Sequence, residues 1–541
     1  MIKSPFENFI SNSRKLLVVD ILIIIPFLLL PLFIKLPYRV NIFLTWEGAY
    51  RLYLGQVPFV DFGLPMGFGF WLIPAAFFKI FGPTFLSLIK AQILINLVSI
   101  ISLRGILYNL KVNPIAITLS LLIFCLTYVI YNFWPWYNHS VVVYELVALY
   151  FLTSYDQTKS RKKNIINLAV AGFFTFISFF TKQDVGGICL VICLFLIGYI
   201  LVSEKVWYPF IIYTAIFVLT AIVFIAPFLK HDFLYWFNYG QAPHSSRISS
   251  ALLFDILFSH SLLEKMYLLA ILGGLIIHVS TWHDFVSSKN IFFITIISLA
   301  FIGQSLITRV TSPLPTDHMT YYHTFGFIGL SIFLPWEKWN KSSFKIMCVA
   351  ILLIASYSEG YWRYVSGLFF KVSTNETTAT TQSLPWASNA LPTMKNILLP
   401  SATNVGIERI MALPILNKKD LKVLNMTELT SLANEIGYTP LTQQPLWYHL
   451  NIGMFQKQVE EINEKVKAGY YDLILFESIP SLNNFNPYEV LDVVEKKYIH
   501  YDSFLAPRRL EDSTIDVFIN PDLAEQFKLV PINDHGNSND H

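Results

Sequence analysis

The chain has 541 residues, of which 54% are hydrophobic and 14% are charged, and its mean hydropathy is +0.51. A soluble chain carries roughly 25% charged residues, so the charges here are too few to cover the surfaces of several soluble domains. The same composition excludes disordered and collagen-like proteins. The sequence therefore predicts an integral membrane protein with a soluble part attached.

The charges divide the chain into two unlike regions. Residues 1–356 hold 24 Lys/Arg and 14 Asp/Glu, a net charge of +10, whereas residues 357–541 hold 15 Lys/Arg and 22 Asp/Glu, a net charge of −7. No basic stripe follows a helix or a face, so we expect no nucleic-acid partner. The 4 cysteines all lie in apolar runs and have neither disulfide nor zinc-site spacing, which is typical of small buried side chains.

Apolar runs long enough to cross a bilayer, roughly 20 residues each, recur along the first region. They predict a polytopic α-helical membrane protein with about eleven spans. A further stretch, 66–82, is short and rich in glycine and aromatic residues, and it contains Pro74 and Lys79. The expected spans are 16–36, 84–104, 114–131, 139–154, 164–181, 185–203, 208–229, 264–281, 290–308, 323–336 and 343–357.

The placement of the basic residues decides whether 66–82 crosses the membrane. Lysine and arginine gather in cytoplasmic loops, and Lys3, Arg14 and Lys15 indicate a cytoplasmic N-terminus. The densest basic cluster, 159–163, would face outward if 66–82 spanned the membrane. We therefore expect 66–82 to be an interfacial or re-entrant helix. This topology predicts a multi-pass protein of the plasma (inner) membrane with an extracytoplasmic C-terminal domain.

The composition changes near residue 357. We expect a transmembrane domain over 1–356 with an outer loop at 37–83, a Ser/Thr/Asn-rich linker over 357–390, and a small α/β domain over 391–541. Apolar residues at helical spacing and short buried runs predict helices at 453–468 and 487–497 and strands at 421–424, 471–476 and 514–519. No nucleophile elbow, phosphate loop or metal spacing occurs in this tail, which favours a lid or docking module over a catalytic domain.

Four phrases on the expected outer side carry a resemblance. They are Gly55-Gln-Val-Pro-Phe-Val-Asp-Phe62, Pro65-Met-Gly-Phe68, Phe77-Phe-Lys-Ile-Phe-Gly82 and Lys182-Gln-Asp-Val-Gly186. In this order they resemble the GT-C superfamily of membrane glycosyltransferases, in the branch of the protein mannosyltransferases and aminoarabinose transferases. The resemblance covers residues 1–356.

The resemblance implies inverting transfer of a sugar from a polyprenyl-phosphate donor to a glycan, lipid or protein acceptor on the extracytoplasmic face. The family's catalytic base is an acidic residue of the first outer loop, about fourteen residues before the glycine of the first phrase. That position is Asn41, which cannot act as a base. Either Glu47 or Asp61 supplies the base, or the protein has lost transferase activity. Asp61 also suits a turn that precedes Gly63.

Other polar residues on the outer side are candidates for substrate contact. A cation must stabilise the departing phosphate, and a charge beside a span is usually functional, although Lys182 and Asp184 also suit a simple ion pair. His139 and Glu145 are interpreted as packing or interfacial residues. The expected donor-phosphate contacts are Lys182, Arg309 and His318, and the expected substrate contacts are Asp184, Tyr321 and Tyr322.

Competing functions remain open at this stage. A lipid-linked glycan transporter or flippase would show internal repeats and midplane charges, which the sequence does not display. A glycan polymerase or ligase of another GT-C branch would place its large outer loop late in the chain. A non-catalytic GT-C-like protein fits the asparagine at position 41. No cofactor is firmly implied and no metal ligands are assigned, although a divalent metal stays open; the expected partners are membrane lipid, the donor and the acceptor.

Overall fold

The computed structural model describes residues 13–39, 42–237, 250–261, 263–311, 320–339, 342–358, 386–479, 486–507 and 513–532. Its internal contacts divide the chain into two compact units. The helical unit consists of Met1–Phe33, Gln92–Pro227 and His244–Val372. The loop–tail unit consists of Ile34–Ala91, Phe228–Pro243 and Ser373–His541, so the first outer loop and the tail belong to one compact body.

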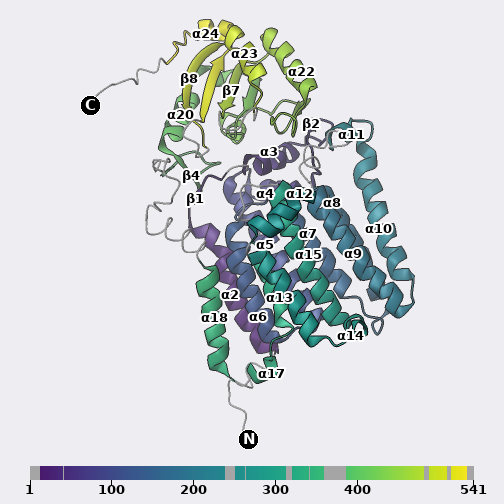
Figure 1. The fold of residues 1–541 in the computed structure, drawn as a ribbon. Coiled ribbons are helices and arrows are strands. Elements are labelled where there is room, and N and C mark those ends of the chain that lie inside the picture. The colour runs from purple at the N-terminus through teal and green to yellow at the C-terminus, as the bar shows by residue number, and fades with distance from the viewer. Residues whose placement is uncertain are drawn as a thin grey trace. The chain divides into compact units, whose positions relative to one another are not determined.

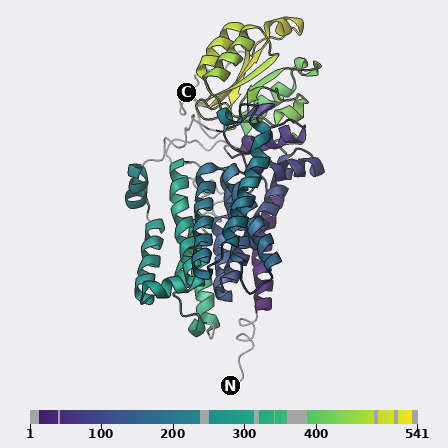
Figure 2. The ribbon, with the colours of Figure 1, turned by 90° about the vertical axis from the view of Figure 1, so that its right-hand side faces the viewer.

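Long helices that run side by side make up the helical unit, as both views of the ribbon show (Figures 1 and 2). Each expected span overlaps one of them. The helices of this unit, short ones included, begin and end as follows, with α5 entering from the other unit at Gln92: α2 (Ser13–Phe33), α5 (Phe85–Asn109), α6 (Pro114–Thr127), α7 (Tyr137–Thr153), α8 (Arg161–Thr181), α9 (Gln183–Glu204), α10 (Tyr208–Ile225), α12 (Ser250–Asp255), α13 (Leu263–His278), α14 (Trp282–Ser287), α15 (Lys289–Thr311), α16 (Tyr322–Ser331), α17 (Trp336–Trp339) and α18 (Ser343–Tyr357).

Helix starts follow local capping signals. The Asn113 side chain accepts a hydrogen bond from the Ile115 N–H at 3.0 Å, and Pro114 occupies the first position of α6, where its missing N–H has no cost. The Ser160 hydroxyl accepts from the Lys163 N–H at 3.3 Å at the start of α8. The span expected at 114–131 begins with α6, whereas the span expected at 164–181 begins three residues after the start of α8.

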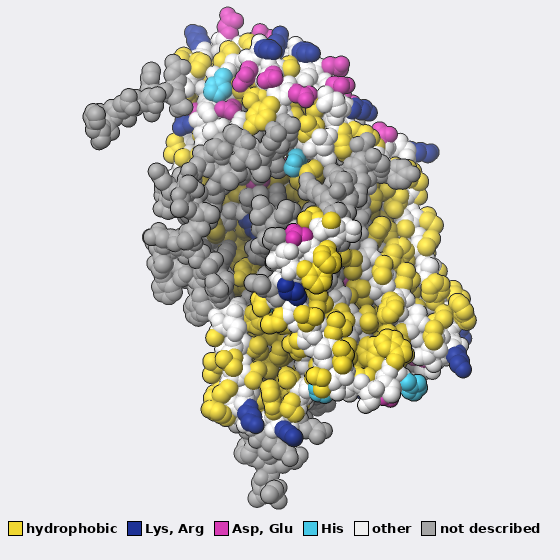
Figure 3. All heavy atoms as spheres, viewed as in Figure 1, with side chains coloured by type: hydrophobic (Ala, Val, Ile, Leu, Met, Phe, Trp, Pro, Cys, Tyr) yellow, Lys and Arg dark blue, Asp and Glu magenta, His cyan; other side chains and the backbone are white. Residues whose placement is uncertain are grey.

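The surface of the helical unit is that of a membrane protein. In the described part of the chain, 7 helices are long and apolar enough to cross a membrane, or up to 8 if a pair bent by 84° forms one span. Hydrophobic side chains cover α10 and α18, whereas charged side chains gather over the part that holds β8 and α23 (Figure 3). Ile276 on α13 is 81% exposed. Exposure of this apolar side chain costs free energy in water but not in lipid. The number of spans, about eleven, stays a prediction.

The loop–tail unit contains all of the described strands and several short helices. From the first outer loop and its flanks come β1 (Leu36–Pro37), α3 (Ile42–Tyr53), β2 (Phe62–Gly63) and α4 (Leu72–Phe81), and from the segment after α10 comes α11 (Phe233–Trp236). The tail adds β3 (Trp386–Ser388), β4 (Ile397–Pro400), α20 (Ser401–Met411), β5 (Val423–Met426), α21 (Leu432–Ile436), β6 (Gln444–Pro445), α22 (Gln456–Lys467), β7 (Leu473–Ser478), α23 (Tyr488–Lys497), β8 (Ile499–Leu505), β9 (Thr514–Ile519) and α24 (Pro521–Gln526).

The tail folds around a mixed sheet of strand order β5-β7-β9-β8. Strands β5 and β7 are parallel, and the β7–β9 and β8–β9 pairs are antiparallel. Val459 and Ile462 of α22 and Val490 of α23 pack in one buried core with Phe476 of β7. The expected helices and strands of the tail overlap observed elements, whereas β8 was not expected. The expected linker, 357–390, lies largely outside the described residues.

Short strands tie the first outer loop to the tail. Strand β1 pairs in parallel with β4, and β2 pairs in parallel with β6. The Tyr38 hydroxyl donates to the Glu428 carboxylate at 2.6 Å. Because every one of these contacts joins residues more than 350 positions apart, the sequence pattern alone does not reveal them. The domain division expected from the sequence, at 356 and 391, stays a prediction.

Candidate functional site

Helix α3 presents the candidate base Glu47. Residues 42–51 of this helix are all buried, and its last turn is followed by Gly55 at φ +87°. Glycine is the residue that adopts this left-handed conformation without strain, and it ends helices for that reason. The Gln56 N–H then bonds back to the Arg51 carbonyl at 2.9 Å. The turn therefore brings Gln56 beside the side chains of the last two turns of α3.

Glu47 and Arg51 form a buried ion pair one helical turn apart. The Arg51 Nε donates to Glu47 Oε1 at 2.9 Å, and Arg51 Nη2 lies 2.7 Å from the same oxygen. The two side chains are 8% and 3% exposed. Glu47 Oε2 has no hydrogen-bond partner among the described residues. Arg51 thus anchors one of the two carboxylate oxygens.

The tail completes the surroundings of this pair. Arg51 Nη1 donates to the Gln56 Oε1 and to the Leu441 carbonyl, each at 3.0 Å. The Gln56 side-chain amide donates to the Pro440 carbonyl at 2.7 Å. Burial raises the pKa of Tyr448 and the charge of Glu47 raises it further, so this phenol lies near the carboxylate. The sequence predicts no site motif in the tail. Residues 438–448 of the tail nevertheless lie beside Glu47 and Arg51.

The environment of Glu47 makes its carboxylate more basic than an exposed one. Burial raises the pKa of Glu47 above its ordinary value, and the charge and hydrogen bond of Arg51 oppose that shift without cancelling it. A carboxylate whose pKa is raised toward neutrality is better suited to accept a proton than an exposed one.

Asp61 occupies a turn in the same unit. Its Oδ2 accepts a hydrogen bond from the Val57 N–H at 2.7 Å, and its backbone carbonyl accepts from the Gln443 N–H at 2.7 Å. The residue is partly exposed. This is the geometry of a turn-stabilising aspartate, and Oδ1 has no hydrogen-bond partner among the described residues. Asn41, at the family's usual aspartate position, lies outside the described residues.

Lys182 and Asp184 meet at a sharp junction in the helical unit. Lys182 is the single residue between α8, which ends at Thr181, and α9, which begins at Gln183. Its ammonium lies 2.9 Å from Asp184 Oδ2, and the two side chains are 12% and 11% exposed. The cation lies at a helix C-terminus and the carboxylate in a first helical turn, which is the placement that helix dipoles favour. The expected ion pair is present.

Arg309 is also paired. Its guanidinium on α15 forms an ion pair with Glu264 on α13, and the Arg309 side chain is 30% exposed against 3% for Glu264. The buried carboxylate fixes the arginine and neutralises much of its charge. His318, the third expected phosphate contact, lies outside the described residues.

Tyr321 and Tyr322 precede and begin α16. Tyr321 is fully buried, and burial raises its pKa, to which the nearby charges of Glu145 and Asp184 add. The ring centroids of Tyr322 and His323 lie 4.1 Å apart. The structure therefore brings Tyr321 and Asp184 into one neighbourhood of the helical unit, whereas Glu47 and Asp61 belong to the loop–tail unit.

Glu145, which the sequence indicates as a packing or interfacial residue, is a buried carboxyl. It lies within α7 with 0% exposure, and it accepts a hydrogen bond from the Gln304 side-chain amide at 2.8 Å. Its Oε1 is buried without a partner among the described residues. Glu145 falls in the expected span 139–154, and a carboxyl within a membrane span is costly and usually functional. The signal was present in the sequence, because Glu145 interrupts an apolar run.

Metal ligands are not grouped in the described part of the chain, where no cluster of three or more His, Cys, Asp or Glu side chains could hold an ion. The site residues present instead carboxylates and cations. Such groups can accept a proton and balance the charge of a phosphate.

Comparison with known proteins places the fold. No protein-family model matches the chain, and no curated protein sequence matches it. The crystal structure of apo ArnT from Cupriavidus metallidurans matches it with a TM-score of 0.50 at 11% identity, over 93% of this chain and 98% of that chain. ArnT of the same organism bound to undecaprenyl phosphate matches with a TM-score of 0.47 at 11% identity, over 93% and 97%. The likeness to apo ArnT shows a GT-C-like membrane fold, which confirms the resemblance at the level of fold.

Proposed function

Starting from this GT-C-like fold, we propose that the chain is a membrane glycosyltransferase that moves a sugar from a polyprenyl-phosphate donor to a glycan, lipid or protein acceptor. The observation that carries the proposal is the likeness to apo ArnT over 93% of the chain. The phrases at 55–62 and 182–186, which resemble those of GT-C enzymes, add support. We further propose that the reaction takes place on the extracytoplasmic face of the plasma (inner) membrane.

Glu47 is the proposed base. In an inverting transfer, the acceptor oxygen or nitrogen attacks the anomeric carbon and the bond from that carbon to the phosphate oxygen breaks. The electron pair leaves with the phosphate, and the acceptor proton passes to the carboxylate. Glu47 suits this role because Arg51 anchors Oε1 while Oε2 has no hydrogen-bond partner in the described part of the chain. Its raised pKa favours proton acceptance.

Asp61 is the alternative base. Its Oδ1 has no hydrogen-bond partner among the described residues, but its Oδ2 holds the turn at Val57. Substitution of Asp61 would therefore loosen the loop even if the residue took no part in chemistry. A pH profile separates the two roles, because it follows the residue that titrates.

Lys182 and Arg309 are the proposed contacts to the donor phosphate, together with His318. Each of the two described cations is held by a carboxylate, Asp184 or Glu264, which orients the positive group. Cations fixed in advance stabilise a departing phosphate better than mobile ones, because no reorganisation is needed during the reaction. Asp184, Tyr321 and Tyr322 are the proposed substrate contacts.

The test uses the purified chain with a panel of polyprenyl-phosphate sugars and acceptors. We expect Glu47→Gln to lower kcat at least about 100-fold, since general-base catalysis contributes that much, while its amide oxygen still accepts from Arg51. The exposed Glu460 on α22 gives the matched control, and Glu460→Gln should retain wild-type activity. If Glu47→Gln keeps full activity while Asp61→Asn lowers kcat at least about 100-fold, and the residual activity has lost the acid limb of its pH profile, Asp61 is the base.

A non-catalytic GT-C-like protein is the second candidate, because Glu47 is engaged by Arg51 inside a buried pair. That function predicts binding of polyprenyl-phosphate sugars without turnover for any acceptor. A wild-type chain that binds a donor yet releases no polyprenyl phosphate would establish it, whereas transport of a lipid-linked glycan in vesicles would instead support a flippase.

A further inference from the structure

A cavity of about 390 Å³ opens in the helical unit among α2, α5, α6 and the loop between α7 and α8. It belongs neither to the candidate base nor to the proposed phosphate contacts. Three cations and two carboxylates line it, and its wall reaches the surface because Tyr108 is 63% exposed. The charged lining residues are Asp20, Arg104, Lys111, Asp156 and Lys159.

Arg104 is held with one edge of its guanidinium available. Its Nε donates to Asp20 Oδ2 at 2.8 Å, and the Thr118 hydroxyl donates to Asp20 Oδ1 at 2.5 Å. The Asp20 side chain is 2% exposed against 27% for Arg104. In the described part of the chain, Nη1 and Nη2 of Arg104 make no hydrogen bond. This leaves the edge that binds phosphate oxygens in a planar, two-point manner.

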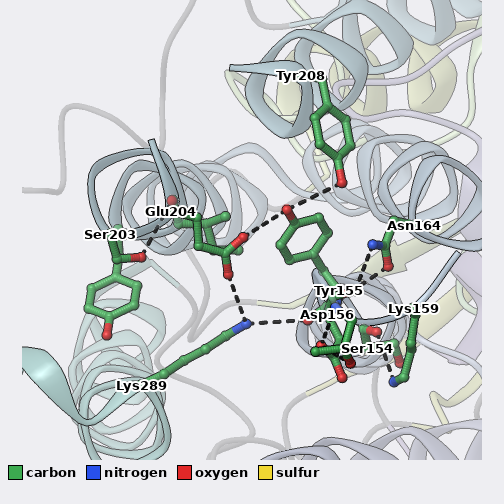
Figure 4. A network of polar contacts seen from close by, with 12 residues as sticks. Ser154, Tyr155, Asp156, Lys159, Asn164, Ser203, Glu204, Tyr208 and Lys289 are labelled. Atoms are coloured by element: carbon green, nitrogen blue, oxygen red, sulfur yellow. Dashed lines mark hydrogen bonds and ion pairs between the residues drawn. The ribbon is translucent and has the colours of Figure 1, made fainter. Parts of the chain in front are cut away.

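The second carboxylate of the cavity, Asp156, accepts hydrogen bonds from its own loop. Figure 4 shows Asp156 beside Asn164 and Lys159 in a network that also includes Lys289. The Thr158 N–H and hydroxyl donate to Asp156 Oδ1 at 2.9 and 2.7 Å, and the Asn164 side-chain amide donates to the Asp156 carbonyl at 2.7 Å. These bonds fix the loop. The Lys159 ammonium donates one hydrogen bond to the Ser154 carbonyl at 3.3 Å, and an ammonium group has two further donors.

An apolar strip leads away from the cavity along α5. Leu94, Leu97, Ile101 and Tyr108 are 40%, 38%, 54% and 63% exposed, and Arg104 falls in the same series at spacings of three and four residues. Such spacing places them on one face of a helix. The cation suits a phosphate group, and the exposed apolar strip suits hydrocarbon chains. A molecule that joins the two would fit both.

We propose that this cavity binds the phosphate of an anionic glycerophospholipid, whose acyl chains lie along the exposed face of α5. The contacts are the free edge of Arg104 and the ammonium groups of Lys111 and Lys159. Basic pockets between membrane helices recognise lipid head groups by this charge pairing. The proposal does not rest on the transferase activity. With the cytoplasmic side assigned to 159–163, the lipid belongs to the inner leaflet.

The test measures lipid binding by native mass spectrometry of the full chain in mild detergent, with phosphatidylglycerol and phosphatidylcholine as probes. The double variant Lys111→Gln/Lys159→Gln removes two exposed cations and leaves the Asp20–Arg104 pair intact. We expect it to weaken phosphatidylglycerol binding about thirty-fold, from the usual contribution of a basic residue near an anionic lipid. Phosphatidylcholine binding should not change.

The experiment also needs a matched control variant and a variant that should strengthen lipid binding. Lys162 and Lys205 are exposed and lie outside the cavity, so Lys162→Gln/Lys205→Gln should bind phosphatidylglycerol as the wild type does. Asp156→Asn removes a negative charge while keeping an acceptor oxygen for Thr158, and it should tighten binding several-fold. Equal losses in both double variants, or displacement of the lipid by millimolar inorganic phosphate, would overturn the proposal.

Discussion

The buried pair of Glu47 and Arg51 supports a quantitative prediction. Arg51→Met removes a cation whose side chain is 3% exposed and leaves Glu47 without a partner. Breaking a buried ion pair from one side costs about 3–5 kcal/mol, because an uncompensated charge stays in a poorly solvated place. For a body of this size, each kcal/mol lowers the unfolding midpoint by about 2–4 °C. We therefore expect the loop–tail unit to lose about 6–20 °C in unfolding midpoint at pH 7.

The loss should depend on pH in a defined direction. The folded-state pKa of Glu47 is raised above its ordinary value of 4.5, and removal of Arg51 raises it further. The folded state then binds more protons than the unfolded state, so stability falls as pH rises from 4.5 through the folded-state pKa. Arg51→Met should therefore be closest to the wild type at acid pH, and the difference between them should grow as the pH rises.

The assay is scanning calorimetry combined with hydrogen exchange of residues 436–446, because two units need not unfold together. The double variant Arg51→Met/Glu47→Gln should recover part of the loss, with a coupling energy of about 1–3 kcal/mol. Lys457→Met is the control, since the Lys457–Glu461 pair on α22 has the same spacing but its side chains are 62% and 44% exposed. It should cost less than about 0.5 kcal/mol. Equal effects of Arg51→Met and Lys457→Met, or a loss that does not shrink at acid pH, would refute the reasoning.

Further predictions concern packing and the buried carboxyl of the helical unit. A Cβ at Gly48 would lie 2.2 Å from the Trp71 ring, so Gly48→Ala should destabilise the loop–tail unit by about 1–3 kcal/mol in calorimetry, and an unchanged midpoint would contradict that contact. Glu145→Leu removes the acceptor of the Gln304 amide and should cost about 1–3 kcal/mol, whereas Glu145→Gln keeps an acceptor and should cost less. Equal midpoints for the two Glu145 variants would argue against the hydrogen bond.

Helix positions were predictable because their signals are local. An apolar run such as 208–229 is long enough to span a bilayer wherever it occurs, and it overlaps α10. Asn113 followed by Pro114 marks the start of α6 by capping chemistry between neighbours. In the tail, the spacing of Val459, Ile462 and Val466 places them on one face of α22, and all three are buried.

The candidate site was predictable only in part. Lys182 and Asp184 form the expected pair because two positions at a helix junction are neighbours in any fold. The pairing of Arg309 with Glu264 was not foreseen, since the two lie on different helices. The interpretation of Glu145 as a packing or interfacial residue did not name its partner, because Gln304 lies on another helix.

By itself, the sequence determined the class of this protein: its 14% charge, its apolar runs and its divided charge indicate a helical membrane protein with a soluble tail. The charge content is a sum over residues, and an apolar run lies within one helix, so neither depends on tertiary contacts. Only the tertiary structure decided that the first outer loop and the tail form one unit, where Arg51 of α3 bonds both Glu47 and the Leu441 carbonyl. The second of these bonds joins residues 390 positions apart, and no local periodicity encodes such a pair. The pair forms because burial of Arg51 in the folded chain removes water from its guanidinium, which then needs protein acceptors for its hydrogen bonds.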